Sequence, residues 1–157
     1  MVLWSVTHGF LGTVFAMGLT VAIWQALFPA RRSPGSLRIN VMAMTVLVTV
    51  KIFLGDLVYT TYRAPAPDSA RSLIIAGSRP WVHTIIMESK EHMAHFLPAI
   101  MLVAVALLFV YDIHEPENRT ARKVFVSLLA ISLALSLAAL FMGALISSTA
   151  SVNGVRS

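Results

Sequence analysis

Four apolar stretches, each long enough to cross a lipid bilayer, constrain the fold of this chain more than any other feature. They run from about Leu3 to Phe28, Ile39 to Tyr62, Pro80 to Tyr111 and Val124 to Ile146. At about 1.5 Å per residue, a helix over each stretch spans a hydrocarbon core of about 30 Å. A helix also satisfies its own backbone hydrogen bonds in lipid. We therefore expect an all-α, four-helix transmembrane bundle that forms one domain over residues 1–157.

The composition agrees with a membrane protein and excludes several function classes. Only 12% of the residues are charged and 57% are hydrophobic, whereas a soluble domain carries about 25% charged residues. The basic residues lie in short connections beside the apolar stretches, and no basic segment offers the water-exposed face that nucleic-acid binding needs. The chain has 0 cysteines, which excludes disulfides, thiolate ligands and covalent c-type haem attachment.

The third stretch is too long for a simple span, and it contains a proline. Pro98 lacks a backbone N–H and releases a carbonyl one turn earlier, so we expect a kinked third helix. The segment from 63 to 79 is predicted to be a loop whose Leu73–Ile75 lies in the membrane interface. The segment from 147 to 157 is polar and is predicted to be a frayed tail.

The distribution of Arg and Lys predicts the orientation. The first and third connections carry Arg31, Arg32, Arg38, Arg119, Arg122 and Lys123, and the opposite side carries Arg63, Arg71, Arg79 and Arg156. Because positive residues favour the cytoplasmic side, we expect a multi-pass protein of the inner (cytoplasmic) membrane with both termini outside.

Ionisable residues inside the spans mark the candidate functional region. The third stretch contains His83, Glu88, Lys90, Glu91, His92 and His95, the second contains Lys51, Asp56, Tyr59 and Tyr62, and the first contains His8. In the predicted topology all of them fall in the outer half of the bundle. A charge at the centre of a membrane helix costs about 2.5–3.5 kcal/mol on insertion scales, so these residues need a reason to be there.

Helical spacing places four of these residues in one stripe. Glu88, Glu91, His92 and His95 are separated by three, four and seven positions, which puts them on one helix face. Lys90 and His83 point to the other side. Because charged groups avoid lipid, we expect the stripe to face the interior of the bundle. His114 lies in a charged connection and is expected to face water.

The imidazoles favour a haem b or transition-metal site. Imidazole nitrogen binds haem iron, copper, zinc and non-haem iron, and bundles build such sites from facing helices. His92 or His95 with His8 would form a bis-imidazole pair for haem b. For a metal ion, the same two histidines would act with carboxylates, and the candidates are Glu88, Glu91 and Asp56. A di-iron centre fits poorly, because its Glu-x-x-His spacing is absent.

Two other hypotheses stay open. Glu, His, Lys and Tyr in an apolar bundle are groups that bind a quinone head and relay its protons. In the other, Lys90 pairs with Asp56, and Lys51 pairs with Glu88 or Glu91, as buried ion pairs of a structural or assembly subunit. The favoured hypothesis is a small membrane subunit of a redox or electron-transfer complex, embedded in lipid beside other subunits or copies of itself. The sequence leaves open whether it is an enzyme.

Overall fold

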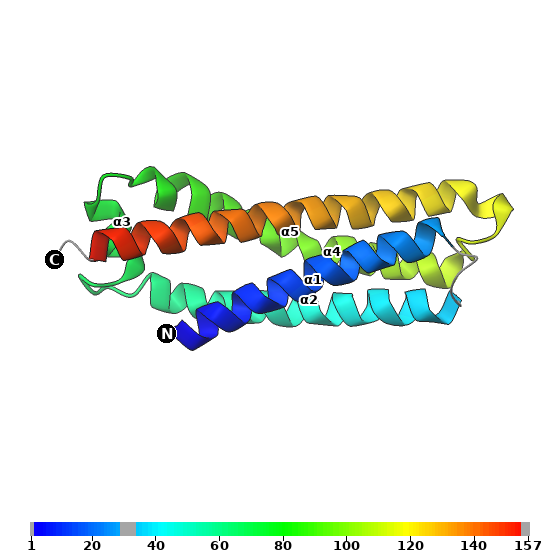
Figure 1. Cartoon of the computed structure of the whole chain (residues 1–157), viewed down its shortest axis with the longest axis horizontal. Helices are drawn as coiled ribbons and strands as arrows, with labels where there is room; N and C mark the ends of the chain where they lie inside the picture. The colour runs from blue at the N-terminus through cyan, green and yellow to red at the C-terminus, as the bar shows by residue number, and fades with distance from the viewer. Residues whose placement is uncertain (1, 29–33, 155–157) are drawn as a thin grey trace.

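The computed structural model describes residues 2–28 and 34–154 and confirms the all-α membrane bundle. Its four long helices are α1 (Val2–Leu27), α2 (Pro34–Tyr62), α4 (Glu88–Val110) and α5 (Arg119–Gly154). They lie side by side along the long axis of the molecule (Figure 1). In the described part of the chain, four helical segments are long and apolar enough to cross a membrane.

The four long helices form a ring in which each packs on two neighbours. α1 packs on α2 and α5, and α4 packs on the same two helices. Successive helices run in opposite directions, so the two ends of the chain lie at the same end of the bundle (Figure 1). We call this the terminal end, and we call the other the opposite end.

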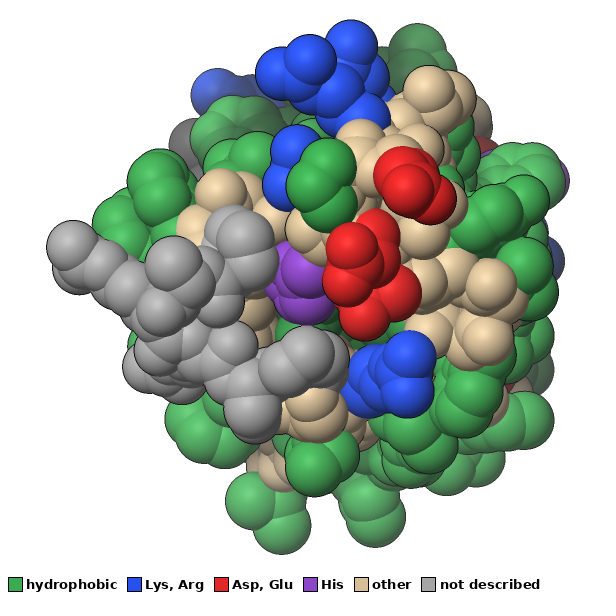
Figure 2. Space-filling view, turned by 90° about the vertical axis from the view of Figure 1, so that its right-hand side faces the viewer, with side chains coloured by type: hydrophobic (Ala, Val, Ile, Leu, Met, Phe, Trp, Pro, Cys, Tyr) green, Lys and Arg blue, Asp and Glu red, His purple; other side chains and the backbone are tan. Residues whose placement is uncertain are grey.

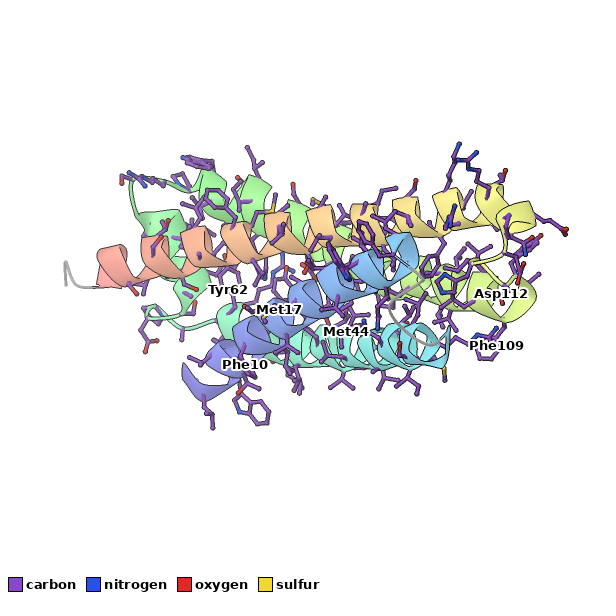
Figure 3. The ribbon with its side chains drawn as sticks, turned by 45° about the vertical axis from the view of Figure 1, so that its right-hand side comes forward. Phe10, Met17, Met44, Tyr62, Phe109 and Asp112 are labelled. Carbon is purple, nitrogen blue, oxygen red and sulfur yellow. The ribbon has the colours of Figure 1, made fainter. Side chains whose placement is uncertain are left out.

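One apolar stripe from each long helix fills the middle of the ring. The buried side chains include Phe15 and Leu19 of α1, Val41 and Val48 of α2, Leu97 and Met101 of α4, and Phe125 and Leu129 of α5. Within each helix they recur at three-, four- or seven-residue spacing. Large hydrophobic side chains also cover the outside, where Phe53 and Phe141 are exposed, and Phe10 projects from α1 (Figure 3). This outer surface suits lipid as the solvent.

The segment from 63 to 79, which was predicted to be a loop, contains a short helix at the terminal end. A short helix, α3 (Ala70–Ala76), begins after Ser69, whose hydroxyl accepts a hydrogen bond from the backbone N–H of Ser72. Such a cap satisfies a backbone donor that the helix start leaves free. Ile74 is fully buried in a cluster that contains Tyr62 and Ile146. α3 therefore packs on the terminal end through this residue.

The third span is irregular at its beginning. A π-helical turn, η2 (Val82–Met87), precedes α4, and α4 continues through Pro98 to Val110. The turn packs against both α3 and α5. A π-helical turn is wider than an α-helical one, so it changes the direction in which the side chains before and after it point.

The last helix is longer than the sequence predicted. It begins at Arg119, directly after the single turn η3 (Pro116–Asn118), and it ends at Gly154. The prediction of a frayed tail is wrong over 147–154. Ser148 and Thr149 donate their hydroxyl hydrogens to the carbonyl of Leu145 at 2.9 and 2.8 Å. Their polar groups are thus satisfied within the helix.

The opposite end bears the charges of the α4–α5 connection. Figure 2 looks onto this end, where acidic and basic side chains gather while the flanks are mostly hydrophobic. Asp112 lies here, far from Tyr62 (Figure 3). His114 is partly buried, and its Nδ1 is buried without a hydrogen-bond partner among the described residues. The expectation that His114 faces water is therefore wrong for that nitrogen.

Candidate functional site

A groove between α2 and α4 gathers most of the candidate residues. It lies in the half of the bundle near the terminal end and has a volume of about 360 Å³. Its lining consists of Tyr59, Arg63, Glu88, Glu91, His92, His95 and Phe96. The four residues of the predicted stripe therefore do share one region, together with Tyr59 of α2 and Arg63, which directly follows α2.

The groove opens on the outside of the bundle, so the prediction that His92 and His95 face the interior is wrong. Both histidines are exposed. The reason lies in the core stripe of α4, in which Leu97, Met101 and Ala104 are fully buried. Residues one or two positions away from this stripe point about 100–200° away from it. The histidines therefore turn outward together with the exposed Phe96.

The two histidines present the same ring nitrogen to the groove. Nδ1 of His92 lies 2.7 Å from the carbonyl oxygen of Glu88, and Nδ1 of His95 lies 2.8 Å from that of Glu91. A carbonyl only accepts hydrogen bonds, so each Nδ1 carries the hydrogen and Nε2 remains for another partner. No other described residue bonds to Nε2 of His92. Nε2 of His92 is therefore a ring nitrogen of the groove that has no hydrogen-bond partner among the described residues.

Nε2 of His95 already has a neighbour on α2. It lies 3.3 Å from Oδ1 of Asp56, and both side chains are about half exposed. The Nε2 lone pair of a neutral imidazole would repel a carboxylate oxygen. A hydrogen bond between the two atoms needs a proton on one of them. The structure thus brings together two candidate ligands, His95 and Asp56, that come from different helices.

An ion pair closes the terminal end of the groove. Arg63 donates a hydrogen bond from a terminal guanidinium nitrogen to Oε1 of Glu88 at 3.0 Å. The same oxygen accepts the hydroxyl of Tyr59 at 3.4 Å, and the guanidinium lies 4.9 Å from the centre of the Tyr59 ring. Glu88 is therefore held by α2, which limits its freedom to act as a metal ligand.

His8 lies apart from this groove. Its Nδ1 donates to the carbonyl oxygen of Lys51 at 3.1 Å. Its ring packs so closely on Gly55 that a Cβ there would lie 2.8 Å from Cε1. His8 is thus seated between α1 and α2 and does not line the groove. A bis-imidazole pair of His8 with His92 or His95 is not assembled among the described residues.

Lys51 and Lys90 point into the bundle and lack the predicted carboxylate partners. The side chain of Lys51 is almost fully buried and reaches Gly12 of α1, while Lys90 reaches Gly143 of α5. In the described chain no carboxylate oxygen lies within 4.0 Å of either amine. The expected pairs of Lys90 with Asp56 and of Lys51 with Glu88 or Glu91 are therefore wrong.

A buried network at the terminal end was missed by the sequence analysis. Arg71 of α3 donates from Nε to Nε2 of His83 at 3.2 Å, and Nδ1 of His83 lies 3.0 Å from the hydroxyl oxygen of Tyr62. Because Nε2 accepts, the hydrogen of the neutral ring is on Nδ1. The sequence analysis predicted only that His83 points away from the stripe, and the structure shows that it is buried. Nothing in the sequence spacing indicates that Arg71 folds back onto it.

A complete metal site is not assembled within the described residues. They contain no group of three or more His, Asp or Glu side chains arranged to hold a metal ion. His92, His95, Glu91 and Asp56 supply donors, but any further ligands would have to come from another chain. The groove thus supplies hydrogen-bond donors, acceptors and an aromatic ring more readily than a closed ligand set.

Comparison of the chain with protein-family models, curated proteins and solved structures found no match.

Proposed function

We propose that the chain is a membrane subunit of a redox complex and that the groove between α2 and α4 binds the head group of a lipid-soluble quinone. The observation that carries the proposal is the free Nε2 of His92 beside Phe96 in a groove of about 360 Å³. Small-molecule sites typically have volumes of about 300–1,000 Å³, mostly apolar walls and a few fixed polar groups.

The lining matches both oxidation states of a quinone head. The guanidinium of Arg63, which has N–H groups beyond the one bonded to Glu88, is a donor for a quinone carbonyl oxygen. Nε2 of His92 is an acceptor for a quinol hydroxyl, and the carboxylate of Glu91 is a second acceptor. When a quinol is oxidised, it loses two protons and two electrons. These two acceptors take the protons, and the electrons pass to a redox centre of a partner subunit.

The position of the groove supports access from the membrane. It opens on the outer flank of the helices, where Phe96 is 64% exposed. A quinone dissolved in lipid would reach such a site sideways, without crossing water. We place the groove in the outer half of the cytoplasmic membrane, as the Arg and Lys distribution predicts.

Quinone binding by the purified protein tests the proposal. A short-chain quinone is titrated into the protein in detergent, and quenching of tryptophan emission reports binding. His92→Gln removes the ring, and we expect the dissociation constant to rise by about tenfold, the loss of about one hydrogen bond. His114→Gln at the opposite end is the matched control. Absence of binding by the wild type, or equal binding by His92→Gln, would reject the proposal.

A second candidate is a haem b or metal site completed by a partner chain. The observation that favours it is the pair of Nδ1–carbonyl hydrogen bonds at His92 and His95. Histidines that bind metals usually donate their other N–H in this way. A reduced-minus-oxidised absorption spectrum and metal analysis of the purified complex test it. His92→Ala or His95→Ala should remove the cofactor and leave the helical content unchanged. A complex without a haem signal or stoichiometric metal would exclude this candidate.

A further inference from the structure

The inner face of the bundle carries a second group of polar residues, distinct from the groove. They lie where the core stripes of the four helices continue toward the terminal end. Seven residues before the buried Phe15 comes His8, three after Val48 comes Lys51, and seven before Leu97 comes Lys90. By helical periodicity, these basic residues occupy core positions of three different helices.

Small residues make room for these long side chains. On α1, a Cβ at Gly12 would lie 3.4 Å from Nζ of Lys51, and on α5 a Cβ at Gly143 would lie 3.6 Å from Cε of Lys90. Lys51 is 3% exposed. Gly12 also packs against Leu140 of α5, three residues before Gly143, and Nδ1 of His8 donates to the carbonyl oxygen of Lys51. The three basic groups therefore converge in one interior region.

Among the described residues, no carboxylate oxygen pairs with either amine there. A lysine ammonium has three N–H donors and no acceptor. Glu91 is the acidic residue whose charge acts on Lys90, and Asp56 is the one whose charge acts on His8. Neither carboxylate lies within 4.0 Å of an amine. On the facing part of α5, between 124 and 154, there is no ionisable residue.

The neighbouring face of α5 holds unsatisfied hydroxyls. Ser132 and Ser136 are 0% exposed, and neither Oγ has a hydrogen-bond partner among the described residues. Ser136 lies one turn from Leu140, whose side chain would be 3.0 Å from a Cβ at Gly12, beside Lys51. Hydroxyl groups can donate as well. The interior thus presents amine and hydroxyl donors from three helices, although each hydroxyl can also accept.

We propose that Lys51 and Lys90 bind a small monovalent anion of the halide class in the interior of the bundle. One anion accepts hydrogen bonds from both amines at once and offsets the repulsion between them. It also removes the penalty of a buried charge without a partner, which is large in an apolar interior. The apolar surroundings favour a weakly hydrated monovalent ion over sulfate. The site is separate from the groove and does not depend on a quinone.

Chloride binding by the full-length protein in detergent tests the anion site. Protein prepared in gluconate is titrated with chloride, and the line width of the ³⁵Cl resonance is measured. We expect saturable broadening, and a rise in the midpoint of thermal unfolding with chloride but not with sulfate, because a ligand of the native state stabilises it. Lys51→Met and Lys90→Met should each weaken binding about tenfold or more. Lys123→Met, the third lysine of the chain, should bind as the wild type does.

Three results would overturn the anion site, and two of them come from the wild type and the methionine variants. One is a wild type whose line width and unfolding midpoint are the same in chloride and gluconate, which would mean that the amines are uncharged or hydrated. The other is unchanged chloride binding in Lys51→Met. If the methionine variants do not fold, Lys51→Arg replaces them. It keeps the charge and should keep the chloride dependence, and loss of that dependence in a folded Lys51→Arg protein would also count against the site.

Discussion

At the residue scale, the two tyrosines at the end of α2 differ in how much their hydroxyls contribute to stability. The hydroxyl of Tyr62 is buried and lies 3.0 Å from Nδ1 of His83, whereas that of Tyr59 makes a long 3.4 Å contact with Glu88 at the surface. A buried hydrogen bond contributes about 0.5–1.5 kcal/mol, and leaving a buried partner unsatisfied adds to the loss.

We therefore expect Tyr62→Phe to lower the free energy of unfolding by about 1–2 kcal/mol. Tyr59→Phe is the matched control and should change it by less than about 0.5 kcal/mol. Unfolding of the purified protein in a denaturing detergent, followed by circular dichroism, measures both. Equal effects of the two substitutions would contradict the assignment of His83 as the buried partner.

The charged residues support a second prediction at this scale. Lys51 lies inside the bundle and Glu91 lines the outer groove, so the two side chains should contribute to stability independently. The changes in unfolding free energy for Lys51→Met and Glu91→Leu should add to within about 0.5 kcal/mol in the double variant. A broken buried ion pair would instead cost about 3–5 kcal/mol and be rescued in the double variant. Such a rescue would restore the ion-pair hypothesis that the structure contradicts.

At the scale of elements, the contact between α1 and α2 depends on a glycine. A Cβ at Gly55 would lie 2.8 Å from Cε1 of His8, and the ring cannot turn freely because Nδ1 is bonded to the carbonyl of Lys51. We expect Gly55→Ala to lower the unfolding free energy by about 1–3 kcal/mol through overpacking. Adding His8→Ala should restore most of the loss, since the clashing ring is then absent.

Gly9 provides the control for this contact. It is on the same helix as His8, and a Cβ there would meet nothing within 4 Å. Gly9→Ala should leave stability unchanged or raise it by up to about 1 kcal/mol, because alanine favours a helix. Thermal unfolding of the wild type and these three variants gives the comparison. If Gly55→Ala were as well tolerated as Gly9→Ala, His8 would not be held against α2 as described.

The sequence predicted the elements better than it predicted which way they face. Apolar length alone located the four spans, because lipid requires helices of about 20 residues. The facing of α4 was wrong because the charged stripe was expected inside. Extending the core positions Leu97 and Met101 backward by seven residues would have put Lys90 inside and His92 outside. The groove partner Asp56 and the fold-back of Arg71 depend on contacts between helices, which no periodicity within one helix contains.

At the scale of the whole molecule, the two halves of the bundle differ in chemistry. The half near the terminal end carries the groove, the buried amines and the network around His83. The opposite half is packed mainly by the apolar core, with one amide cluster in which Asn40 donates to Oε1 of Gln25 and to the carbonyl of Gly18, both at 3.1 Å. The proposed quinone groove and the proposed anion site both lie in the half near the terminal end. The orientation of the bundle therefore decides which compartment the site serves.

Orientation is testable because the chain has no native cysteine, so a single introduced thiol is labelled without background. Ser78, in the connection after α3, and Glu117, in the connection before α5, are both exposed and lie at different ends. The Arg and Lys distribution predicts that the terminal end is outside. A membrane-impermeant maleimide should therefore label Ser78→Cys in intact cells, and label Glu117→Cys only after the membrane is permeabilised. Val103→Cys, at an exposed position within the third span, should stay largely unlabelled in both conditions, because a thiolate does not form readily in lipid.

Labelling of Glu117→Cys alone in intact cells would invert the orientation and place the groove toward the cytoplasm. Equal labelling of Ser78→Cys and Glu117→Cys in intact cells would instead contradict the crossing of the membrane by α4, since that span separates the two positions.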